Sequence, residues 1–137
     1  MSTNAPFSWP VRVYYEDTDA GGVVYHANYL RFFERARTEW LRAKGINQSQ
    51  FAAATGFLFV LSEVSVSFRR PARLDDELSV SCDLIEARAA SLRFQQKLVR
   101  SSDQEQLVQL ECRVALIDAA SFKPAVLPAF LKESLLA

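Results

Sequence analysis

The sequence predicts an α+β fold in which a five-stranded antiparallel sheet wraps around one long central helix. Residues 28–44 hold the longest helical pattern; one short strand pattern precedes it and four long ones follow. Short connections between the strand patterns favour antiparallel neighbours. A single helix with one apolar face needs a broad sheet to cover that face, and a curved sheet provides the cover.

Length and composition indicate one domain over residues 1–137. Half of the residues are hydrophobic and 12% are aromatic, which is enough for a core. The 16 basic residues balance 16 acidic ones, which argues against nucleic acid as a partner. No apolar run approaches the ~18 residues of a membrane helix, and the first ten residues lack a targeting pattern. We therefore expect no membrane span and a cytoplasmic location.

The two cysteines, Cys82 and Cys112, are expected to be buried free thiols because both fall on the apolar phase of strand patterns. A disulfide is not expected in a reducing compartment. Two isolated cysteines and one histidine without CxxC spacing also fail to predict a zinc site. We expect no metal and no cofactor.

The N-terminal half is predicted to hold a strand, a loop and two helices. Residues 9–16 alternate as a strand, residues 17–27 form a loop, and a shorter helix at about residues 49–55 follows the long one. Both helices stop at a glycine. The apolar face of the long helix is predicted to carry Tyr29, Phe33, Ala36, Trp40 and Ala43.

The C-terminal part is predicted to be strands that alternate apolar and polar side chains, with one buried and one wetter face. These strands cover residues 57–70, 77–89, 91–100 and 105–118, and a terminal helix covers residues 127–136. An open sheet of this kind has two edges, and long open edges invite pairing. We therefore expect a homodimer whose sheet continues across the interface.

The segment of residues 16–29, EDTDAGGVVYHANY, has the composition of a functional site. It holds three carboxylates, two of the four glycines and the only histidine. The long helix starts directly behind it, and the free N–H groups and positive dipole end of a helix start polarise carbonyls and hold anions. The rest of the chain has the pattern of a scaffold.

This loop, the helix segment ERARTE and the later segment ARLDD resemble the 4-hydroxybenzoyl-CoA thioesterase superfamily of hotdog-fold acyl-CoA thioesterases, and within it the Tol–Pal-associated branch. The likeness covers nearly the whole chain, and its DxDxG…HxxY segment is long enough to be specific. The resemblance implies a hotdog fold, hydrolysis of acyl-CoA or acyl carrier protein thioesters, and a homodimer or homotetramer.

Residue by residue, the resemblance makes Asp19 the catalytic carboxylate. It makes His26 the residue that opens the helix and directs its backbone N–H at the thioester carbonyl. Relatives that hydrolyse benzoyl-CoA carry a tyrosine there, whereas histidine is the pattern of the Tol–Pal-associated branch. The acyl chain is therefore expected to be aliphatic.

The residues themselves offer the same chemistry. Thioester hydrolysis needs a nucleophile or base, which Asp19 can supply, and a stabiliser for the oxyanion. The backbone N–H groups around Tyr25, His26 and Ala27 can supply the second. Against this, the Asp19 side chain also suits an Asx-turn, which spacing alone makes equally acceptable.

Four further residues are candidates for substrate binding. Gly21 and Gly22 lack a Cβ, so an acyl chain or pantetheine arm can approach the backbone there. Arg70 and Arg88 lie at strand ends or turns, where they can meet the phosphates of coenzyme A. The alternatives are an ordinary turn for the glycines and solvated strand ends for the arginines.

Two other functions stay open from the sequence. A hydratase or dehydratase of the same fold would shuttle protons between a histidine and a carboxylate, for which His26 and Asp19 on one short loop are less suited. A non-catalytic partner in lipid or envelope assembly would bind acyl-CoA or acyl carrier protein without turnover. Release of a free thiol separates a thioesterase from both.

Overall fold

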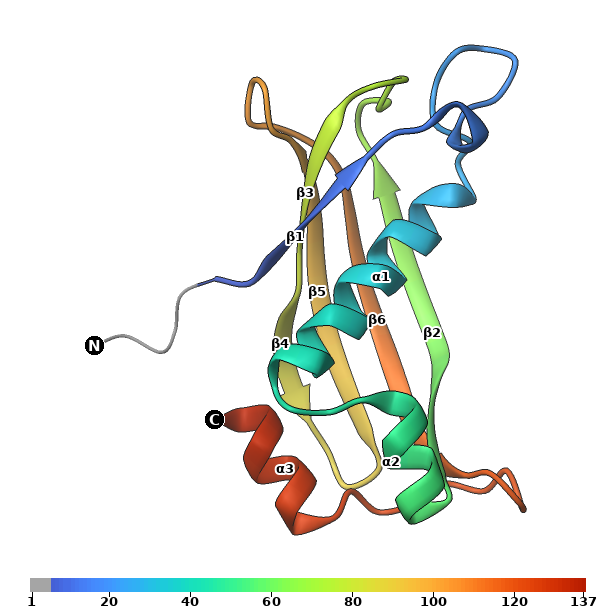
Figure 1. Ribbon diagram of the computed structural model, residues 1–137, viewed down its shortest axis with the longest axis vertical. Helices are drawn as coiled ribbons and strands as arrows, with labels where there is room; N and C mark the ends of the chain where they lie inside the picture. The colour runs from blue at the N-terminus through green and yellow to red at the C-terminus, as the bar shows by residue number, and fades with distance from the viewer. Residues whose placement is uncertain (1–5) are drawn as a thin grey trace.

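A curved antiparallel sheet wraps around the long helix α1 (Asn28–Ala43) in the computed structural model, which describes residues 6–137 (Figure 1). The strands are β1 (Ser8–Arg12), β2 (Phe57–Phe68), β3 (Glu77–Ser81), β4 (Asp83–Ala87), β5 (Ser91–Arg100) and β6 (Glu105–Asp118). Their order is β1-β3-β5-β6-β2, and β4 also pairs with β5. The predicted α+β class and hotdog architecture are confirmed.

The strand predicted over residues 77–89 is interrupted at Cys82, which divides it into β3 and β4. Both parts pair with β5, so they follow one path across the sheet. At the interruption the Cys82 N–H donates to the Phe7 carbonyl, 3.4 Å away. The sheet therefore has five strand paths, as predicted, although it contains six strands.

The strand predicted over residues 9–16 is wrong in its second half. β1 ends at Arg12, and Tyr15–Asp17 form the short 3-10 turn η1. The buried Asp17 carboxylate accepts a hydrogen bond from the Tyr14 N–H at 2.8 Å. This local side-chain bond replaces a strand partner and turns the chain away from the sheet.

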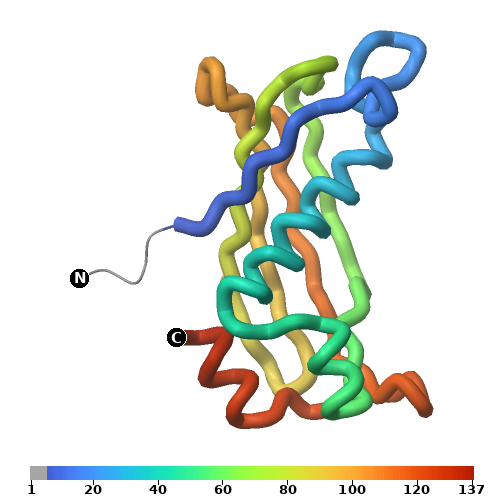
Figure 2. The backbone as a smooth tube through the Cα atoms, in the orientation of Figure 1, coloured from blue at the N-terminus to red at the C-terminus, as the bar shows by residue number. Residues whose placement is uncertain are grey.

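Residues 6–137 form three α-helices. α2 (Gln48–Thr55) starts at Asn47, whose side chain accepts the Gln50 N–H, and stops at Gly56 with a φ of +75°. α3 (Ala129–Leu136) starts two residues later than predicted and lies at the end of the molecule opposite the loop of residues 18–27 (Figure 2). No helix within residues 6–137 has both the length and the apolar composition that a bilayer crossing requires.

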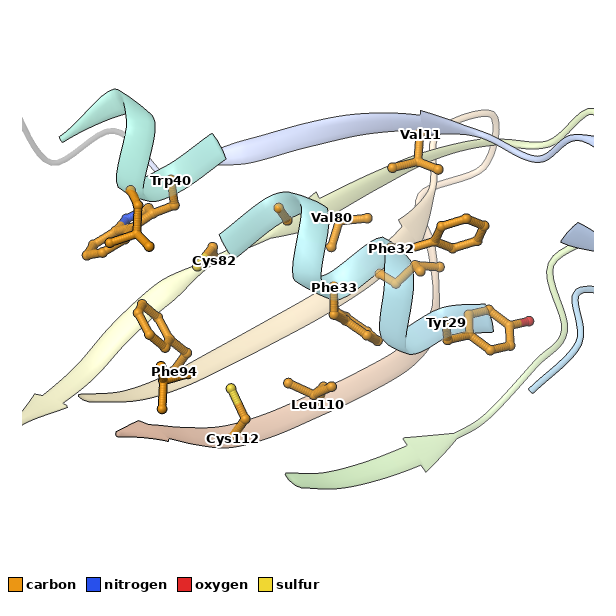
Figure 3. Packing of buried hydrophobic residues seen from close by; sticks show 14 of the residues in the cluster. Val11, Tyr29, Phe32, Phe33, Trp40, Val80, Cys82, Phe94, Leu110 and Cys112 are labelled. Atoms are coloured by element: carbon orange, nitrogen blue, oxygen red, sulfur yellow. The ribbon is translucent and has the colours of Figure 1, made fainter. Parts of the chain in front are cut away.

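The core lies between α1 and the concave face of the sheet (Figure 3). The predicted face of α1 is confirmed for Tyr29, Phe33, Ala36 and Trp40, which are all buried. Ala43 is exposed, because it stands in the last turn of the helix, so its prediction was wrong. Trp40 meets Phe94 of β5 edge to face, with ring centroids 5.2 Å apart.

Both cysteines are buried free thiols, as predicted. Burial raises the pKa of Cys82 and Cys112, and the positive charge of Arg37 opposes this only in part. The two thiols therefore stay protonated and pack as small apolar side chains.

Candidate active site

The loop before α1 is folded into a narrow hairpin. Thr18 and Val24 form an isolated antiparallel bridge. The Asp19 N–H donates to the Val23 carbonyl at 2.9 Å, and the Gly22 N–H donates to the Asp19 carbonyl at 3.0 Å. Gly22 has a φ of +78°, a conformation that a side chain would strain. The hairpin places Asp19 at its exposed corner.

One of the two oxygens of the Asp19 carboxylate accepts a hydrogen bond. Its Oδ1 accepts the Gly21 N–H at 2.8 Å, which is the Asx-turn that the sequence left open. Its Oδ2 makes no hydrogen bond within residues 6–137. A Cβ on Gly21 would lie 3.2 Å from Oδ1, so the glycine lets the turn close. One oxygen is thus oriented by the backbone while the other is left for chemistry.

Asp17 anchors the hairpin from inside. It is 8% exposed, and its Oδ1 accepts a 2.7 Å hydrogen bond from the Asn28 side chain at the start of α1. Its backbone carbonyl accepts the Tyr25 N–H at 2.9 Å. Together with the bond from the Tyr14 N–H, these contacts tie η1 to the helix start. Asp17 therefore fixes where the loop delivers the chain into α1.

The start of α1 presents unbonded donors. The Asn28 N–H donates to the Tyr25 carbonyl at 2.8 Å, which forms a turn over His26 and Ala27. Of the three N–H groups that we expected to be available, that of Tyr25 is taken by Asp17, whereas those of His26 and Ala27 donate to nothing within residues 6–137. Both residues are exposed. Two free N–H groups at the positive end of a helix are suited to hold an oxyanion.

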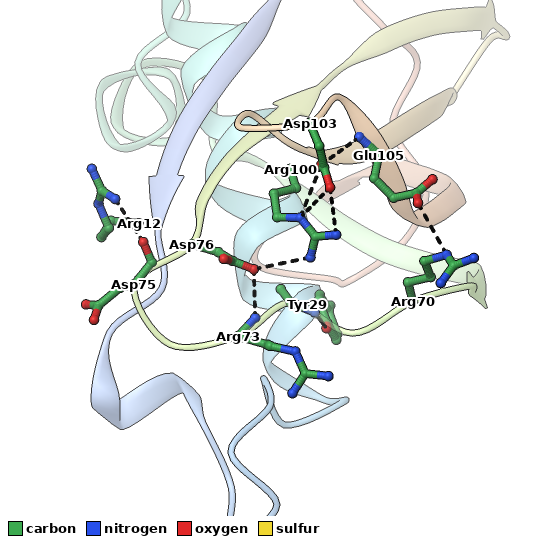
Figure 4. Close-up of polar contacts among 10 residues, drawn as sticks. Arg12, Tyr29, Arg70, Arg73, Asp75, Asp76, Arg100, Asp103 and Glu105 are labelled. Carbon is green, nitrogen blue, oxygen red and sulfur yellow. Dashed lines mark hydrogen bonds and ion pairs between the residues drawn. The ribbon is translucent and has the colours of Figure 1, made fainter.

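Tyr29 links the hairpin to the neighbouring segment of residues 69–76 (Figure 4). Its hydroxyl oxygen accepts the Ala72 N–H at 2.9 Å, and the Ala72 carbonyl accepts the Val24 N–H at 2.9 Å. Burial raises the pKa of the Tyr29 phenol; the bond from Ala72 opposes this and the negative charges of Asp76 and Asp19 add to it. The phenol therefore stays neutral.

The segment of residues 69–76 is itself held by a charged cluster (Figure 4). The Asp76 Oδ2 accepts the Arg73 N–H at 2.9 Å and lies 3.6 Å from an Arg100 nitrogen. Arg100 also bonds Asp103, with a closest distance of 3.0 Å, and holds the pKa of that carboxyl below its usual range. The hairpin thus rests on a segment that side chains of β5 and its turn keep in place.

A shallow pocket opens beside the helix start. Its lining residues are Val24, His26, Tyr29, Phe68, Arg69, Arg70 and Pro71. Arg70 therefore lies near His26, and its guanidinium pairs with Glu105 at 3.3 Å. Arg88 follows β4 at the opposite end of the sheet and pairs with Glu86 at 3.1 Å. Within one chain, Arg70 and Arg88 do not come together.

The sequence analysis missed two residues that shape this site. Tyr29 was assigned to the core alone, although a tyrosine among phenylalanine and alanine positions signals a polar partner for its hydroxyl. Asp76 lies between two predicted strands, with no local sign in the sequence that it would bond a strand residue. Within residues 6–137, no three histidine, cysteine, aspartate or glutamate side chains converge as metal ligands would.

The chain is similar to known proteins in both sequence and structure. Residues 13–135 match the family model described as the thioesterase-like superfamily. The chain is 47% identical over 122 residues to the acyl-CoA thioester hydrolase YbgC of Escherichia coli, and the aligned residues cover 89% of this chain and 90% of that protein. It is 44% identical to the acyl-CoA thioesterase YbgC of Haemophilus influenzae, with 92% and 91% covered.

Solved structures share the fold. A probable thioesterase from Bartonella henselae superposes with a TM-score of 0.85 at 35% identity, covering 90% of this chain and 100% of that one. A 1,4-dihydroxy-2-naphthoyl-CoA thioesterase from Synechocystis superposes with a TM-score of 0.88 at 23% identity, covering 96% of each chain. The second likeness, at that identity, concerns the fold alone.

Proposed function

Because the chain belongs to the thioesterase-like superfamily, as the sequence predicted, we propose that it hydrolyses aliphatic acyl-CoA thioesters to a carboxylic acid and coenzyme A. The observation that carries this proposal is the pair of unbonded N–H groups at His26 and Ala27, on the same loop as the exposed Asp19 carboxylate. These groups supply the oxyanion stabiliser and the base or nucleophile that the reaction needs.

Two routes use these groups. In the first, the Asp19 carboxylate takes a proton from water as the water oxygen attacks the thioester carbon. The oxyanion is held by the two N–H groups until it collapses and expels the thiolate of coenzyme A, which takes the proton from Asp19 and so regenerates the carboxylate. In the second, Asp19 attacks the carbon itself and expels the thiolate of coenzyme A, which leaves a mixed anhydride. Water then cleaves the anhydride to the Asp19 carboxylate and the free acid, and the proton released converts the thiolate to the thiol. Both routes yield one acid and one thiol per water consumed.

The remaining candidates take supporting roles in this proposal. We assign to the His26 ring, whose centroid lies 4.5 Å from that of Tyr25, the role of orienting Asp19, the water or the leaving group. Gly21 and Gly22 close the turn that orients Asp19. Arg70 lines the pocket, and we assign it to the phosphates of coenzyme A or of acyl carrier protein.

The proposed assembly is a homodimer or a homotetramer built from it. β2 pairs only with β6 among the described strands, so its 12 residues leave an open edge. Its Leu61, Val64 and Phe68 are 46%, 38% and 54% exposed, which supports a covered edge. Arg88 would then reach a substrate only from another copy.

The free thiols in the core support a reducing compartment, so we place this activity in the cytoplasm. Coenzyme A is a substrate component here, and the proposed mechanism uses no resident cofactor.

The test is free-thiol release from a panel of short, long and aromatic acyl-CoAs, with Asp19→Asn as the variant. The asparagine oxygen can still accept the Gly21 N–H, so the turn is kept while the carboxylate is lost. We expect kcat to fall about 10²- to 10⁴-fold, the range for a lost base or nucleophile. The control is Asp83→Asn, an exposed aspartate at the start of β4.

Undiminished release by Asp19→Asn would assign the chemistry to another residue. An absence of release from every acyl-CoA, together with tight binding, would replace hydrolysis with the binding-partner function. An enoyl thioester without free thiol would indicate the hydratase or dehydratase.

A further inference from the structure

One phenylalanine is exposed on a strained backbone. Phe122 lies in the turn of residues 119–123, which follows β6, and it is 67% exposed. Its φ is +62°, in the left-handed region that a bulky side chain rarely adopts and that glycine fills without strain. The strained backbone and the ring left in water both cost free energy, and together they indicate that the ring has a contact outside its own chain.

Hydrogen bonds hold this turn in place. The Phe122 N–H donates to the Asp118 carbonyl at 2.7 Å, and the Asp118 Oδ2 accepts the N–H and the hydroxyl of Ser121 at 2.9 and 2.8 Å. The bonds from Ser121 hold the pKa of the Asp118 carboxyl below its ordinary value. The Ala119 N–H donates to the Gly56 carbonyl at 2.8 Å, which ties the turn to the residue before β2. The turn therefore presents Phe122 from a fixed frame beside the start of β2.

The turn and the candidate active site lie at opposite ends of the edge strand β2. At the start of the strand, Phe57 pairs with Asp118, directly before the turn. At the end of the strand, Phe68 lines the pocket beside His26. Figures 1 and 2 show that the turn and the hairpin of residues 18–27 both project past β2, on the side away from β6. The open edge is thus flanked by two projections, one at each end.

Pairing of two copies through β2 brings these projections together. The other edge strand, β1, holds Pro10, which has no N–H to donate, so β2 is the edge better suited to pairing. Two copies of one strand that pair in antiparallel fashion are related by a two-fold axis, so the start of each β2 lies beside the end of the other. The turn of residues 119–123 in one copy therefore comes next to the hairpin of residues 18–27 in its partner.

Both ends of β2 expose aromatic side chains that this arrangement covers. At the candidate site, Tyr25 is 48% exposed, and Phe68 is exposed beside the pocket. At the turn, Phe122 is the exposed ring. Aromatic rings pack against one another in dimer interfaces, where each of them buries a large apolar area. One contact thus accounts for exposed rings at two places.

We propose that Phe122 of one copy packs over the pocket beside His26 of its partner and there completes an apolar wall for the acyl chain. Each site is then built from two chains, and Phe122 is a specificity-determining residue that acts across the interface. The inference rests on the proposed thioesterase function and on the proposed homodimer. An apolar wall contacts an aliphatic chain and removes it from water, so the ring contributes to kcat/KM for substrates whose chain is long enough to reach it.

The first test is Phe122→Gly, because glycine adopts the same φ without strain and the turn is kept while the ring is lost. We expect kcat/KM for octanoyl-CoA to fall about tenfold to a hundredfold, as the loss of one buried aromatic side chain allows. The value for acetyl-CoA, whose chain is too short to reach the ring, should change less than about threefold. The ratio of the two is taken within each protein, so a general loss of activity cancels.

Phe130→Ala is the matched control for this ratio. Phe130 is also an exposed phenylalanine, but it belongs to α3, which lies away from the β2 edge (Figure 1). This variant should keep the native ratio.

The second test asks which chain supplies the ring. Chains with Asp19→Asn and chains with Phe122→Gly are co-expressed in equal amounts and assemble at random. If the ring acts across the interface, about one site in four combines an unaltered Asp19 with an unaltered Phe122, and the mixture shows about a quarter of the native rate with octanoyl-CoA. If the ring serves its own chain, every site carries one change, and the rate stays at or below about half of that of Phe122→Gly.

A third measurement locates the ring without any hydrolysis. Chains with Phe122→Cys are co-expressed with chains with Tyr25→Cys and treated with a short bis-maleimide, and covalent dimers are detected by denaturing electrophoresis. Cys82 and Cys112 do not compete, because both thiols are buried. Phe122→Cys should cross-link to Tyr25→Cys, whereas Phe130→Cys should not.

A native protein that sediments as a monomer overturns the inference, and so does an octanoyl-to-acetyl ratio that survives in Phe122→Gly. A co-expressed mixture that stays at or below half of the Phe122→Gly rate also overturns it, because the ring then serves its own chain. If the native protein releases thiol from no acyl-CoA, the proposed function fails, and the cross-link still decides whether Phe122 of one copy meets the site of the other.

Discussion

Two irregular segments meet at one end of the molecule, the hairpin of residues 18–27 and the segment of residues 69–76. They differ in how far their polar groups are hydrogen-bonded. The hairpin leaves the His26 and Ala27 N–H groups and one Asp19 oxygen unbonded among the described residues, all in exposed positions. The other segment has its Ala72 N–H and the Asp76 carboxylate bonded to other side-chain or backbone groups.

This difference in hydrogen bonding suits the hairpin to catalysis and the segment of residues 69–76 to structural support. Unbonded polar groups cost little at the surface, where water satisfies them until a substrate arrives, but they are expensive when buried. The hairpin can therefore keep free donors at the surface, while the neighbouring segment, whose Ala72 N–H and Asp76 carboxylate are bonded, fixes it from behind. Changes in the first region should affect the rate, and changes in the second should affect stability.

After the loss of the Asp19 carboxylate, the largest expected effect comes from removing one free donor. His26 is the second residue of the turn from Tyr25 to Asn28, a position where proline is favoured. His26→Pro deletes the N–H and the ring, whereas His26→Ala deletes only the ring. We expect the proline variant to turn over acyl-CoA about 10²- to 10³-fold more slowly than the alanine variant.

Both His26 variants should unfold within about 1 kcal/mol of the native protein, measured by urea denaturation, because an exposed N–H contributes little to stability. Equal rates for His26→Pro and His26→Ala would show that this N–H does not hold the oxyanion. A large stability loss in the proline variant would mean that the turn itself had changed.

An intermediate effect is expected where the two regions join. Tyr29→Phe removes the oxygen that accepts the Ala72 N–H and leaves that donor buried and unpaired. The free energy of unfolding should fall by about 1–3 kcal/mol, and kcat should fall as well, because Ala72 also binds Val24 of the hairpin. Phe32→Leu, a nearby core change that removes no hydrogen bond, is the control and should lower stability alone.

Tyr29 also marks the limit of sequence-based prediction in this chain. The helices and strands were predictable because the period of apolar residues is a local property, and the site-like loop was predictable from its composition. The end of β1 was not, because the Asp17 side chain competes with strand pairing. The Tyr29–Ala72 and Arg37–Gln96 bonds join residues 43 and 59 positions apart. The only local sign of such bonds in the sequence is a polar residue at a position where the pattern predicts an apolar one.

The smallest expected effect lies in the charged cluster behind the segment of residues 69–76. The bonds from Arg100 hold the pKa of Asp103 below its ordinary value, so the folded state favours the ionised carboxylate. A lowered folded-state pKa stabilises the protein above the unfolded-state pKa, and this contribution is lost as the pH falls through the folded-state pKa. Asp103→Asn should therefore melt slightly below the native protein at neutral pH.

The difference in melting temperature between the native protein and Asp103→Asn should shrink once the pH falls below about 4, where unfolded aspartate begins to protonate. Asp75→Asn is the control, since Asp75 lies in the adjacent turn and its side chain forms no ion pair among residues 6–137. A difference that stays constant with pH would mean that Asp103 acts through the shape of its turn. The rate of thioester hydrolysis should be the same in all three proteins, because this cluster supports the hairpin only through the segment between them.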